Sequence, residues 1–505
     1  MSFEPVYGSL KAEERGVICS TQAVIETRLS VPDGVTVKKV LSVSGECYAA
    51  ATEVFSGEAR FSGNCNVSVI YEDENGEKGA LSSEAEFSDR LTDERINGKI
   101  RPFLYASVID VDATESTEKE ICPSLVIEIT LVGSTEKQID YLSACSDGIY
   151  TKQYKAEYLK QVDCADKEVS VPVTVEGTDY AKVFKCSANA VVRKVTALTD
   201  AALVEGDVMT RLIGVNADGM LIEKTQKTEF SEECDLADVR SGDVITCDAA
   251  TFGVSHRSVD EGGSVTVEMN AVVKLCLCAF TRESASVISD TFCMQKQTVE
   301  SLTDRDVCKN MDCVRFVENV SGNVTLDIGN PPAYSVLYFD AVKVNVTSSY
   351  IQSGRLTIEG ILSGTIAYYA EDDKSDCSVN VELPFSVTEN ARFEDDSSVF
   401  VTACAGNTSV RVRRANELGI KAEVCFTAAV CESKRCSFIS ALQEGEEVPK
   451  NDAAVSVHIA ASGEELWDVA KRTGCAPERI MAENPGLELP LKGGERILVY
   501  RNIES

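Results

Sequence analysis

Short alternations of apolar and polar residues recur along most of the chain and predict β-strands. Four apolar residues alternate on one face of "SVNVELPFSV", namely Val379, Val381, Leu383 and Phe385. Three do the same in "NVTLDI", namely Val324, Leu326 and Ile328. Dipeptides typical of tight turns separate such runs, namely Asn75-Gly76, Asp218-Gly219 and Gly262-Gly263. The pattern predicts many antiparallel strands in sandwiches or open barrels.

Three landmarks in this β-rich pattern return at nearly the same period. A glycine interrupts an apolar run at Gly63, Gly206 and Gly360, which are 143 and 154 residues apart. A phenylalanine before a serine follows at Phe87, Phe230 and Phe385, spaced by 143 and 155 residues. A glutamate follows at Glu128, Glu268 and Glu423, spaced by 140 and 155 residues. A period near 150 residues indicates tandem domains rather than a solenoid.

We therefore expect a mainly β protein of three tandem sandwich-like or barrel-like repeats, followed by a small C-terminal module. The expected ranges are 15–155, 158–298 and 315–442 for the repeats, 443–453 for a linker and 454–501 for the module. A glycine within a strand usually marks a bulge or a close backbone approach, and a ligand contact is the rarer alternative.

The last fifty residues follow a different pattern. "VSVHIA" from Val455 predicts a strand, and Ser462 followed by Glu465 has the spacing of a capping box, which places the start of a helix at Ser462. Gly474 is expected to end this helix, and Pro477 fits the first turn of a second one. "RILVY" completes a β-α-α-β order.

Charge and composition limit the classes of partner that the chain can bind. The net charge is −32, from 81 acidic and 49 basic residues, so the surface field repels nucleic acid and anionic lipid headgroups. No run approaches the roughly 20 apolar residues of a membrane helix. The first twenty residues lack the basic start and apolar core of a secretory signal. We therefore expect a cytoplasmic protein that inserts into no membrane.

Candidate chemistry is sparse. The twenty cysteines fit reduced, small apolar core residues better than the disulfides of an exported protein. Cys276 and Cys278 alternate within an expected strand, which disfavours zinc. Cys436 after Lys434-Arg435 is the best candidate for a reactive thiol, although a structural thiol is favoured there. Neither His256 nor His458 belongs to a catalytic motif. We expect no enzyme, metal or cofactor; an enzyme built around His256 and carboxylates in a pocket is the remote alternative.

The C-terminal segment resembles the LysM module over about Val455 to Tyr500. The matching positions are Gly463, Leu466, Trp467, Val469, Ala470, Asn484, Pro485, Gly494 and Ile497. Where the family pattern has Asp-Thr, this chain has Glu464-Glu465, which favours a basic protein surface over a neutral glycan. For Trp467, core packing is favoured over ligand stacking.

Taken together, the repeats and the module resemble spore-coat assembly proteins of the SPOCS–LysM type. That resemblance implies a non-enzymatic adaptor in the mother-cell cytoplasm, located at the forespore surface, whose module docks the coat morphogenetic ATPase. The alternative is a protein of the cell wall or spore cortex that binds peptidoglycan or N-acetylglucosamine chains. By resemblance, the partner-binding groove is formed by Ser462, Gly463, Glu464, Glu465, Leu466, Asn484, Pro485, Gly486 and Leu487.

Overall fold

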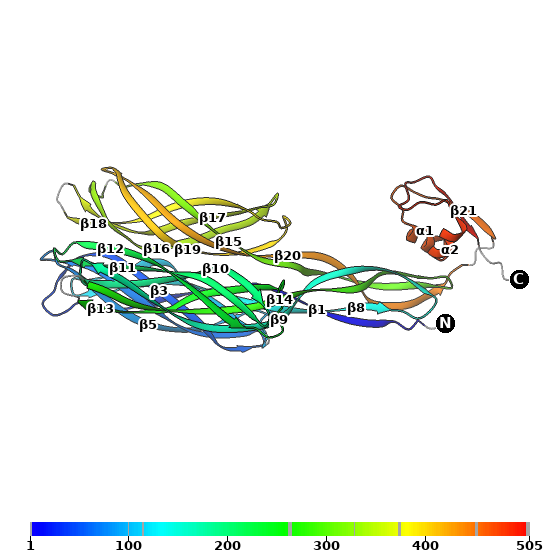
Figure 1. Ribbon diagram of the computed structural model, residues 1–505, viewed down its shortest axis with the longest axis horizontal. Coiled ribbons are helices and arrows are strands. Elements are labelled where there is room, and N and C mark those ends of the chain that lie inside the picture. Colours follow the sequence, from blue (N-terminus) through cyan, green and yellow to red (C-terminus); the bar gives the residue numbers. More distant parts are fainter. Residues whose placement is uncertain are drawn as a thin grey trace.

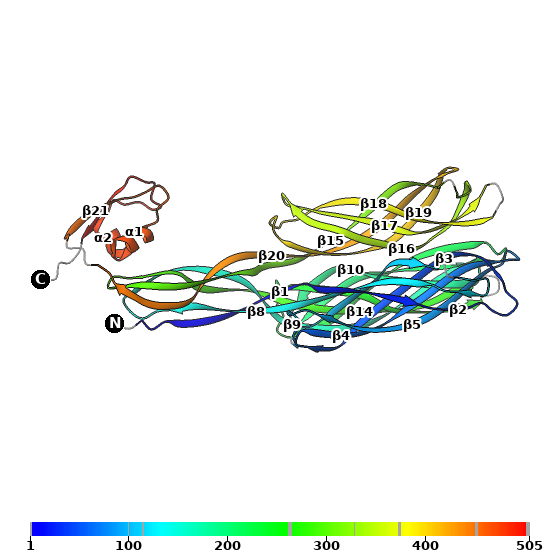
Figure 2. The ribbon, with the colours of Figure 1, turned by 180° about the vertical axis from the view of Figure 1, so that it is seen from behind.

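The computed structural model describes residues 3–98, 100–113, 116–260, 265–327, 329–371, 375–449 and 453–500. The chain is mainly β, as expected, and within these ranges its helices are confined to the C-terminal segment. Figure 1 shows a thick group of sheets at one end, a narrower bundle of long strands leading away from it, and the helical module beside the far end of that bundle. The N-terminus lies at the same end as the module (Figure 2).

Eighteen main strands fall into three consecutive groups of six, which we call units 1 to 3. Unit 1 contains β1 (Val6–Glu26), β3 (Val37–Phe55), β4 (Glu58–Asp73), β5 (Lys78–Thr92), β6 (Phe103–Asp112) and β8 (Ser124–Ala144), and the short β2 (Leu29–Ser30) pairs with β7 (Glu120–Ile121). Unit 2 contains β9 (Ile149–Thr178), β10 (Tyr180–Leu198), β11 (Ala201–Asn216), β12 (Leu221–Asp235), β13 (Val244–Asp260) and β14 (Val265–Cys293). Unit 3 contains β15 (Lys296–Thr325), β16 (Ala333–Gln352), β17 (Arg355–Ala370), β18 (Asp376–Asn390), β19 (Ser398–Arg414) and β20 (Glu417–Glu447).

The same two sheets occur in every unit. A consecutive meander forms one sheet, in the orders β3-β4-β5, β10-β11-β12 and β16-β17-β18. The first and last strands of the unit pair with each other, and a shorter strand pairs with the last one, in the orders β1-β8-β6, β9-β14-β13 and β15-β20-β19. All of these pairs are antiparallel, and an apolar core lies between the two sheets of each unit.

The glycine and phenylalanine landmarks form one structural device. In the ladders, Gly63 lies directly opposite Phe87, Gly206 opposite Phe230, and Gly360 opposite Phe385. A Cβ at Gly360 would lie 2.6 Å from the Phe385 ring and 2.5 Å from the backbone oxygen of Asn345, and the other two glycines are equally crowded. Each glycine therefore makes room for the ring across the strand, which is the close approach expected from the sequence.

The first and last strands of each unit run on beyond the sandwich. Their outer ends form three two-stranded ribbons that pack together, and we call this bundle the stalk. Its core joins the units, with Leu10 and Ile139 from unit 1, Tyr158 and Val287 from unit 2, and Phe438 from unit 3. A second stalk cluster contains Leu142, Ile288 and Ile439. The units are thus joined through a shared apolar core.

These long strands also shift the ends of the units relative to the expected ranges. β1 begins at Val6 rather than near residue 15, and β15 begins at Lys296 rather than near 315. β20 continues to Glu447, so the segment expected as a linker from 443 begins inside a strand. The alternation expected in 379–385 is present, since Val381 and Leu383 are buried between exposed neighbours. Of the strand expected in 323–328, only the first part is formed, because β15 ends at Thr325, before Leu326. Ile328 of this segment and the expected turn at Gly262-Gly263 lie outside the described residues.

Candidate interaction site and central cavity

The C-terminal module contains β21 (Val455–Ile459), α1 (Leu466–Thr473), α2 (Pro477–Glu483) and β22 (Arg496–Tyr500), and β21 pairs antiparallel with β22. This is the expected β-α-α-β order. Gly474 ends α1 in the left-handed conformation, and Pro477 begins α2, both as expected.

The expected start of the first helix at Ser462 is wrong. The helix begins at Leu466, and its N-cap is Glu465, which forms a reciprocal capping box with Asp468. Gly463 has a φ of +79°, so the chain turns there instead of entering a helix. Ser462 and Gly463 are exposed on this turn.

Glu464 is a buried structural residue of the module. Its carboxylate accepts a hydrogen bond from the Ala461 N–H at 2.8 Å and lies 3.0 Å from His458 Nε2 and 3.0 Å from Arg472 Nη1. The hydrogen bonds from His458 and Ala461 hold the pKa of Glu464 below its usual range. The first of the two carboxylates that replace Asp-Thr therefore ties β21 to the turn and to α1.

Trp467 lies between the module and the stalk. Its ring meets Phe292 of β14 edge-on, with centroids 5.1 Å apart, and Phe292 stacks on Tyr150 of β9 at 4.9 Å. The indole Nε1 donates to Asp290 at 2.7 Å, and Lys471 pairs with the other oxygen of Asp290. Trp467 thus packs against the apolar core of the module and, in addition, forms the contact between the module and the stalk.

Glu465, the second of the two carboxylates, also faces the stalk. It forms an ion pair with Lys152 of β9. Both acidic residues of the first loop are therefore engaged within the chain, one inside the module and one with the stalk.

The second expected loop is held to β22. Asn484 donates to the backbone oxygens of Ile480 and Leu498 and accepts from the Leu498 N–H, all within 2.8 Å. Leu466 and Leu487 both pack against the apolar core of the module. Pro485 and Gly486, which lie between Asn484 and Leu487, are exposed.

An apolar surface remains on the outer face of the module's sheet. Alternation turns Val455, Val457 and Ile459 of β21 outward, and Val457 and Ile459 are 58% and 64% exposed. Tyr500 of β22 lies opposite Val455 in the ladder and is also exposed. We call these four residues the outer face. The alternation of "VSVHIA" was expected, but the sequence did not indicate that its apolar side faces away from the helices.

A buried polar cluster lies where the three units meet. Lys185 of unit 2 donates to Asp340 of unit 3 at 2.9 Å and to Ser44 of unit 1 at 2.7 Å. Ser42 of unit 1 donates to the other oxygen of Asp340 at 3.1 Å. All four residues are buried. Burial by itself would raise the pKa of Asp340, but the Lys185 ammonium outweighs it and lowers that pKa. We call this set the junction cluster.

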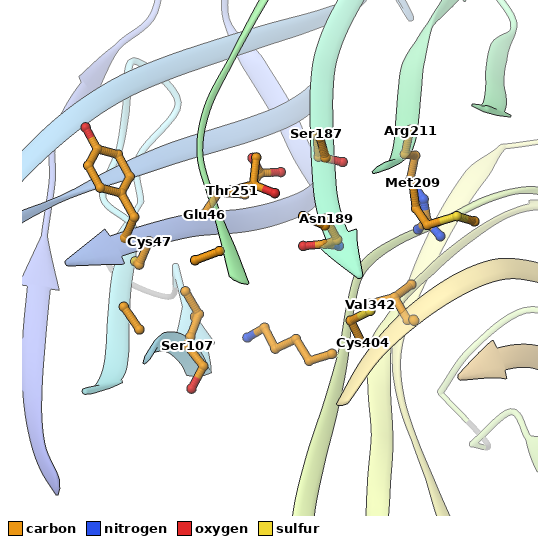
Figure 3. Close-up of a pocket in the computed structure, with 18 of the residues that line it drawn as sticks. Glu46, Cys47, Ser107, Ser187, Asn189, Met209, Arg211, Thr251, Val342 and Cys404 are labelled. Atoms are coloured by element: carbon orange, nitrogen blue, oxygen red, sulfur yellow. The ribbon is translucent and has the colours of Figure 1, made fainter. Parts of the chain in front are cut away.

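Beside the junction cluster, the three units line a partly open cavity of about 950 Å³. Figure 3 shows Glu46, Ser187, Asn189 and Arg211 among its lining side chains. Glu46, Asn189 and Lys343 occupy corresponding positions: each lies three residues before the strand partner of its unit's landmark glycine. An acid, an amide and a base thus occupy the same register position in the three units.

Two of these groups have shifted pKa values that make the stability pH-dependent. Burial raises the pKa of Glu46 to about 7, although Lys185 opposes the shift. Burial lowers the pKa of Lys343 to about 8, although Asp110 opposes it. The folded chain holds a proton on Glu46 that the unfolded chain releases near pH 4.5, so this group lowers stability as pH rises from about 4.5 to 7. Lys343 acts oppositely, and raises stability from about pH 8 to 10.5.

We expect the urea midpoint of Glu46→Gln, relative to the unchanged protein, to rise between pH 5 and 7 and to level off above. The corresponding difference for Lys343→Gln should fall between pH 8 and 10. Urea unfolding followed by circular dichroism measures both. Differences that stay constant with pH would contradict the assignment.

The sequence predicts reduced cysteines that pack as small apolar residues. All twenty lie in the described part of the chain as reduced thiols outside any disulfide, eleven of them buried and nine half-buried. Cys276 and Cys278 lie in the middle of β14 with buried side chains, as expected. Cys436, the best candidate for a reactive thiol, is buried, and burial raises the pKa of its thiol in spite of Lys434, which agrees with the structural role favoured from the sequence.

Other chemistry is limited in the part of the chain that the structure describes. There, no three His, Cys, Asp or Glu side chains gather in a way that could hold a metal ion. His256 lies at the exposed edge of the cavity, and within the described ranges no hydrogen bond or ion pair joins it to a carboxylate. Neither helix has the length and apolar character needed to cross a membrane.

Comparison of the chain with protein-family models, with curated proteins and with solved structures gives no match.

Proposed function

We propose that this protein is a non-enzymatic scaffold that docks a protein partner through the outer face of its C-terminal module. By the resemblance of the sequence, the setting is spore coat assembly at the forespore surface in the mother-cell cytoplasm, and the partner is the coat morphogenetic ATPase. The observation that carries the proposal is the exposed apolar row of Val455, Val457 and Ile459 on β21.

The contacts of the first loop favour this surface over the loops. Glu464 is buried, with an ion pair to Arg472 and a hydrogen bond with His458, and the exposed Glu465 pairs with Lys152 of the stalk. Both carboxylates therefore already have partners within the chain. The outer face, by contrast, gathers four large exposed apolar residues on two paired strands, which is typical of a protein interaction surface. Because the net charge is −32, the surface attracts a partner with basic residues around its apolar patch.

The docking of the module on the stalk supports a scaffold role. Trp467 and Lys471 both contact Asp290, and Trp467 packs on Phe292, so the module is held at one end of an elongated molecule. A partner bound at the outer face would therefore be placed at a fixed distance from the three units.

The experiment is a pull-down of the purified ATPase with the full-length protein carrying Val457→Glu and Ile459→Glu. Burying a new charge at an apolar contact should weaken binding at least about tenfold, equivalent to about 1.4 kcal/mol. The matched control is Val24→Glu, an equally exposed valine in unit 1. Deletion of residues 454–505 should abolish both the pull-down and the forespore localisation.

Binding that survives both the double variant and the deletion would overturn the proposal. Titration of the full-length protein with N-acetylglucosamine oligomers tests the alternative. Saturable binding at micromolar concentration, unaffected by the double variant, would instead favour a glycan-binding protein of the cell wall or cortex.

A further inference from the structure

Eight of the twenty cysteines form four close pairs between neighbouring strands. The Sγ atoms of Cys47 and Cys65 lie 2.7 Å apart, those of Cys164 and Cys278 also 2.7 Å, and those of Cys308 and Cys431 2.6 Å. Cys404 and Cys425 are joined by a thiol hydrogen bond. Every unit contains at least one pair.

The strand register explains three of the pairs. Cys47 lies directly opposite Cys65, Cys164 opposite Cys278, and Cys404 opposite Cys425. Opposite residues of antiparallel strands have Cα atoms about 4.5 or 5.5 Å apart. A disulfide requires a Cα separation of about 4.4–6.8 Å. These thiols can therefore join without movement of the backbone.

The fourth pair is diagonal. Cys308 lies opposite Ser433, and Cys431 lies opposite Met311. The register between β15 and β20 shifts just after Cys308, and this irregularity accompanies the contact of the two buried thiols.

The central cavity gives small molecules access to two of the pairs. Cys47, Cys404 and Cys425 line it, and Figure 3 labels Cys47 and Cys404 among the lining residues. In the Cys164–Cys278 pair, Cys164 is half-buried, whereas both thiols of the Cys308–Cys431 pair are buried. A reagent in solution therefore meets the four pairs to different degrees.

We propose that these four pairs are sites of oxidative modification, at which a low-molecular-weight disulfide such as oxidised glutathione converts the pairs into intrachain disulfides. One cysteine thiolate attacks the reagent, so that a mixed disulfide forms and one reagent thiol leaves. The second thiolate then attacks the cysteine sulfur of the mixed disulfide and expels the other reagent thiol. Two protein thiols are oxidised while one reagent disulfide is reduced to two thiols, and the two thiol protons pass to the leaving thiolates.

The surroundings of the thiols set an order of reaction. The hydrogen bond from Cys404 lowers the pKa of Cys425, and both thiols of this pair line the cavity that a reagent can enter. The hydrogen bond with Cys65, together with burial, raises the pKa of Cys47. The Cys404–Cys425 pair should oxidise first, and the buried Cys308–Cys431 pair last.

The cross-links would lock the sheets that join the units to the stalk. Cys164–Cys278 ties β9 to β14, and Cys308–Cys431 ties β15 to β20. Each of these closes a loop of more than one hundred residues, since the sequence separations are 114 and 123. Long closed loops restrict the unfolded chain most in the entropic account of disulfides.

The test is to incubate the reduced full-length protein with oxidised glutathione, to alkylate it in denaturant and to map its peptides without reduction. We expect linked peptides for 47–65, 164–278, 308–431 and 404–425, with 404–425 appearing first, and alkylation of the other cysteines. The oxidised protein should unfold at higher urea concentration, and dithiothreitol should reverse the shift.

Two controls keep the result interpretable. Cys65→Ser should leave Cys47 as a thiol or a mixed disulfide with glutathione and spare the other three links. Cys313→Ser should change none of them, because Cys313 lies opposite Ala429. The proposal is overturned if the eight paired cysteines are alkylated to the same extent as Cys313, or if the folded protein gives the same scrambled links as protein oxidised in urea.

Discussion

Replacement of Asp340 by alanine is expected to lower the free energy of unfolding by about 3–5 kcal/mol, the usual cost of removing one partner of a buried ion pair. Asp340 is 1% exposed, and it accepts hydrogen bonds from Lys185 and Ser42 at the junction cluster. Without Asp340, the Lys185 ammonium remains in the interior and keeps, among the described residues, the hydrogen bond to Ser44 but no longer its ion pair. Urea unfolding of the full-length protein at pH 7 measures the loss.

A double variant separates the ion pair from general damage to the junction. Lys185→Met with Asp340→Leu removes both charges and should recover most of the loss, because an apolar pair of similar size is no less stable than a buried ion pair. Glu488→Ala is the control, since its ion pair with Lys492 is fully exposed and should change stability by less than about 1 kcal/mol. An Asp340→Ala variant as stable as the control would contradict the prediction.

The second large effect concerns the docking of the C-terminal module. Trp467→Ala should weaken the contact between module and stalk by about 2–4 kcal/mol, in the range of an aromatic residue at the centre of an interface. The substitution removes the edge contact with Phe292 and the 2.7 Å hydrogen bond to Asp290. Limited proteolysis between Glu447 and Val455 should become faster, while the unfolding midpoint of the three units stays unchanged.

The single tryptophan makes the same contact visible by fluorescence. Asp290→Ala keeps Trp467 but removes the acceptor of its indole N–H and the ion-pair partner of Lys471. Its emission should shift to longer wavelength as the ring becomes hydrated. Trp467→Phe retains a ring for Phe292, so its rate of limited proteolysis should lie between those of Trp467→Ala and the unchanged protein. An emission maximum unaffected by Asp290→Ala, with unchanged proteolysis, would show that this contact does not hold the module.

Local signals in the sequence were sufficient for the strands and for the module. The alternation around Val381 and the turn glycines act over a few residues, and so do the caps Gly474 and Pro477. The start of α1 was misplaced because two capping-box spacings overlap, Ser462 with Glu465 and Glu465 with Asp468. The positive φ of Gly463 excludes the first of the two, and the spacing of the residues does not predict this backbone conformation.

Features that join the units could not be predicted. Lys185 and Asp340 are separated by 155 residues, and no local pattern distinguishes them from the many other charged strand residues. The cysteine pairs depend on register: a shift of one residue would turn Cys65 away from Cys47, since successive side chains point to opposite faces. The glycine and phenylalanine landmarks were visible, but their direct opposition appears only when the ladders are aligned.

The long strands of the stalk also have a consequence for synthesis. Val6 pairs with Ala144, and Lys296 pairs with Glu447, so the first strand of a unit finds its partner only after the whole unit has left the ribosome. The meanders β3-β4-β5, β10-β11-β12 and β16-β17-β18 need only neighbouring strands and can form earlier. At a translation rate of about 5–20 residues per second, β1 waits for seconds with its hydrogen-bonding edge open. During that interval the nascent chain depends on its own acidic residues, or on a chaperone, to remain unaggregated.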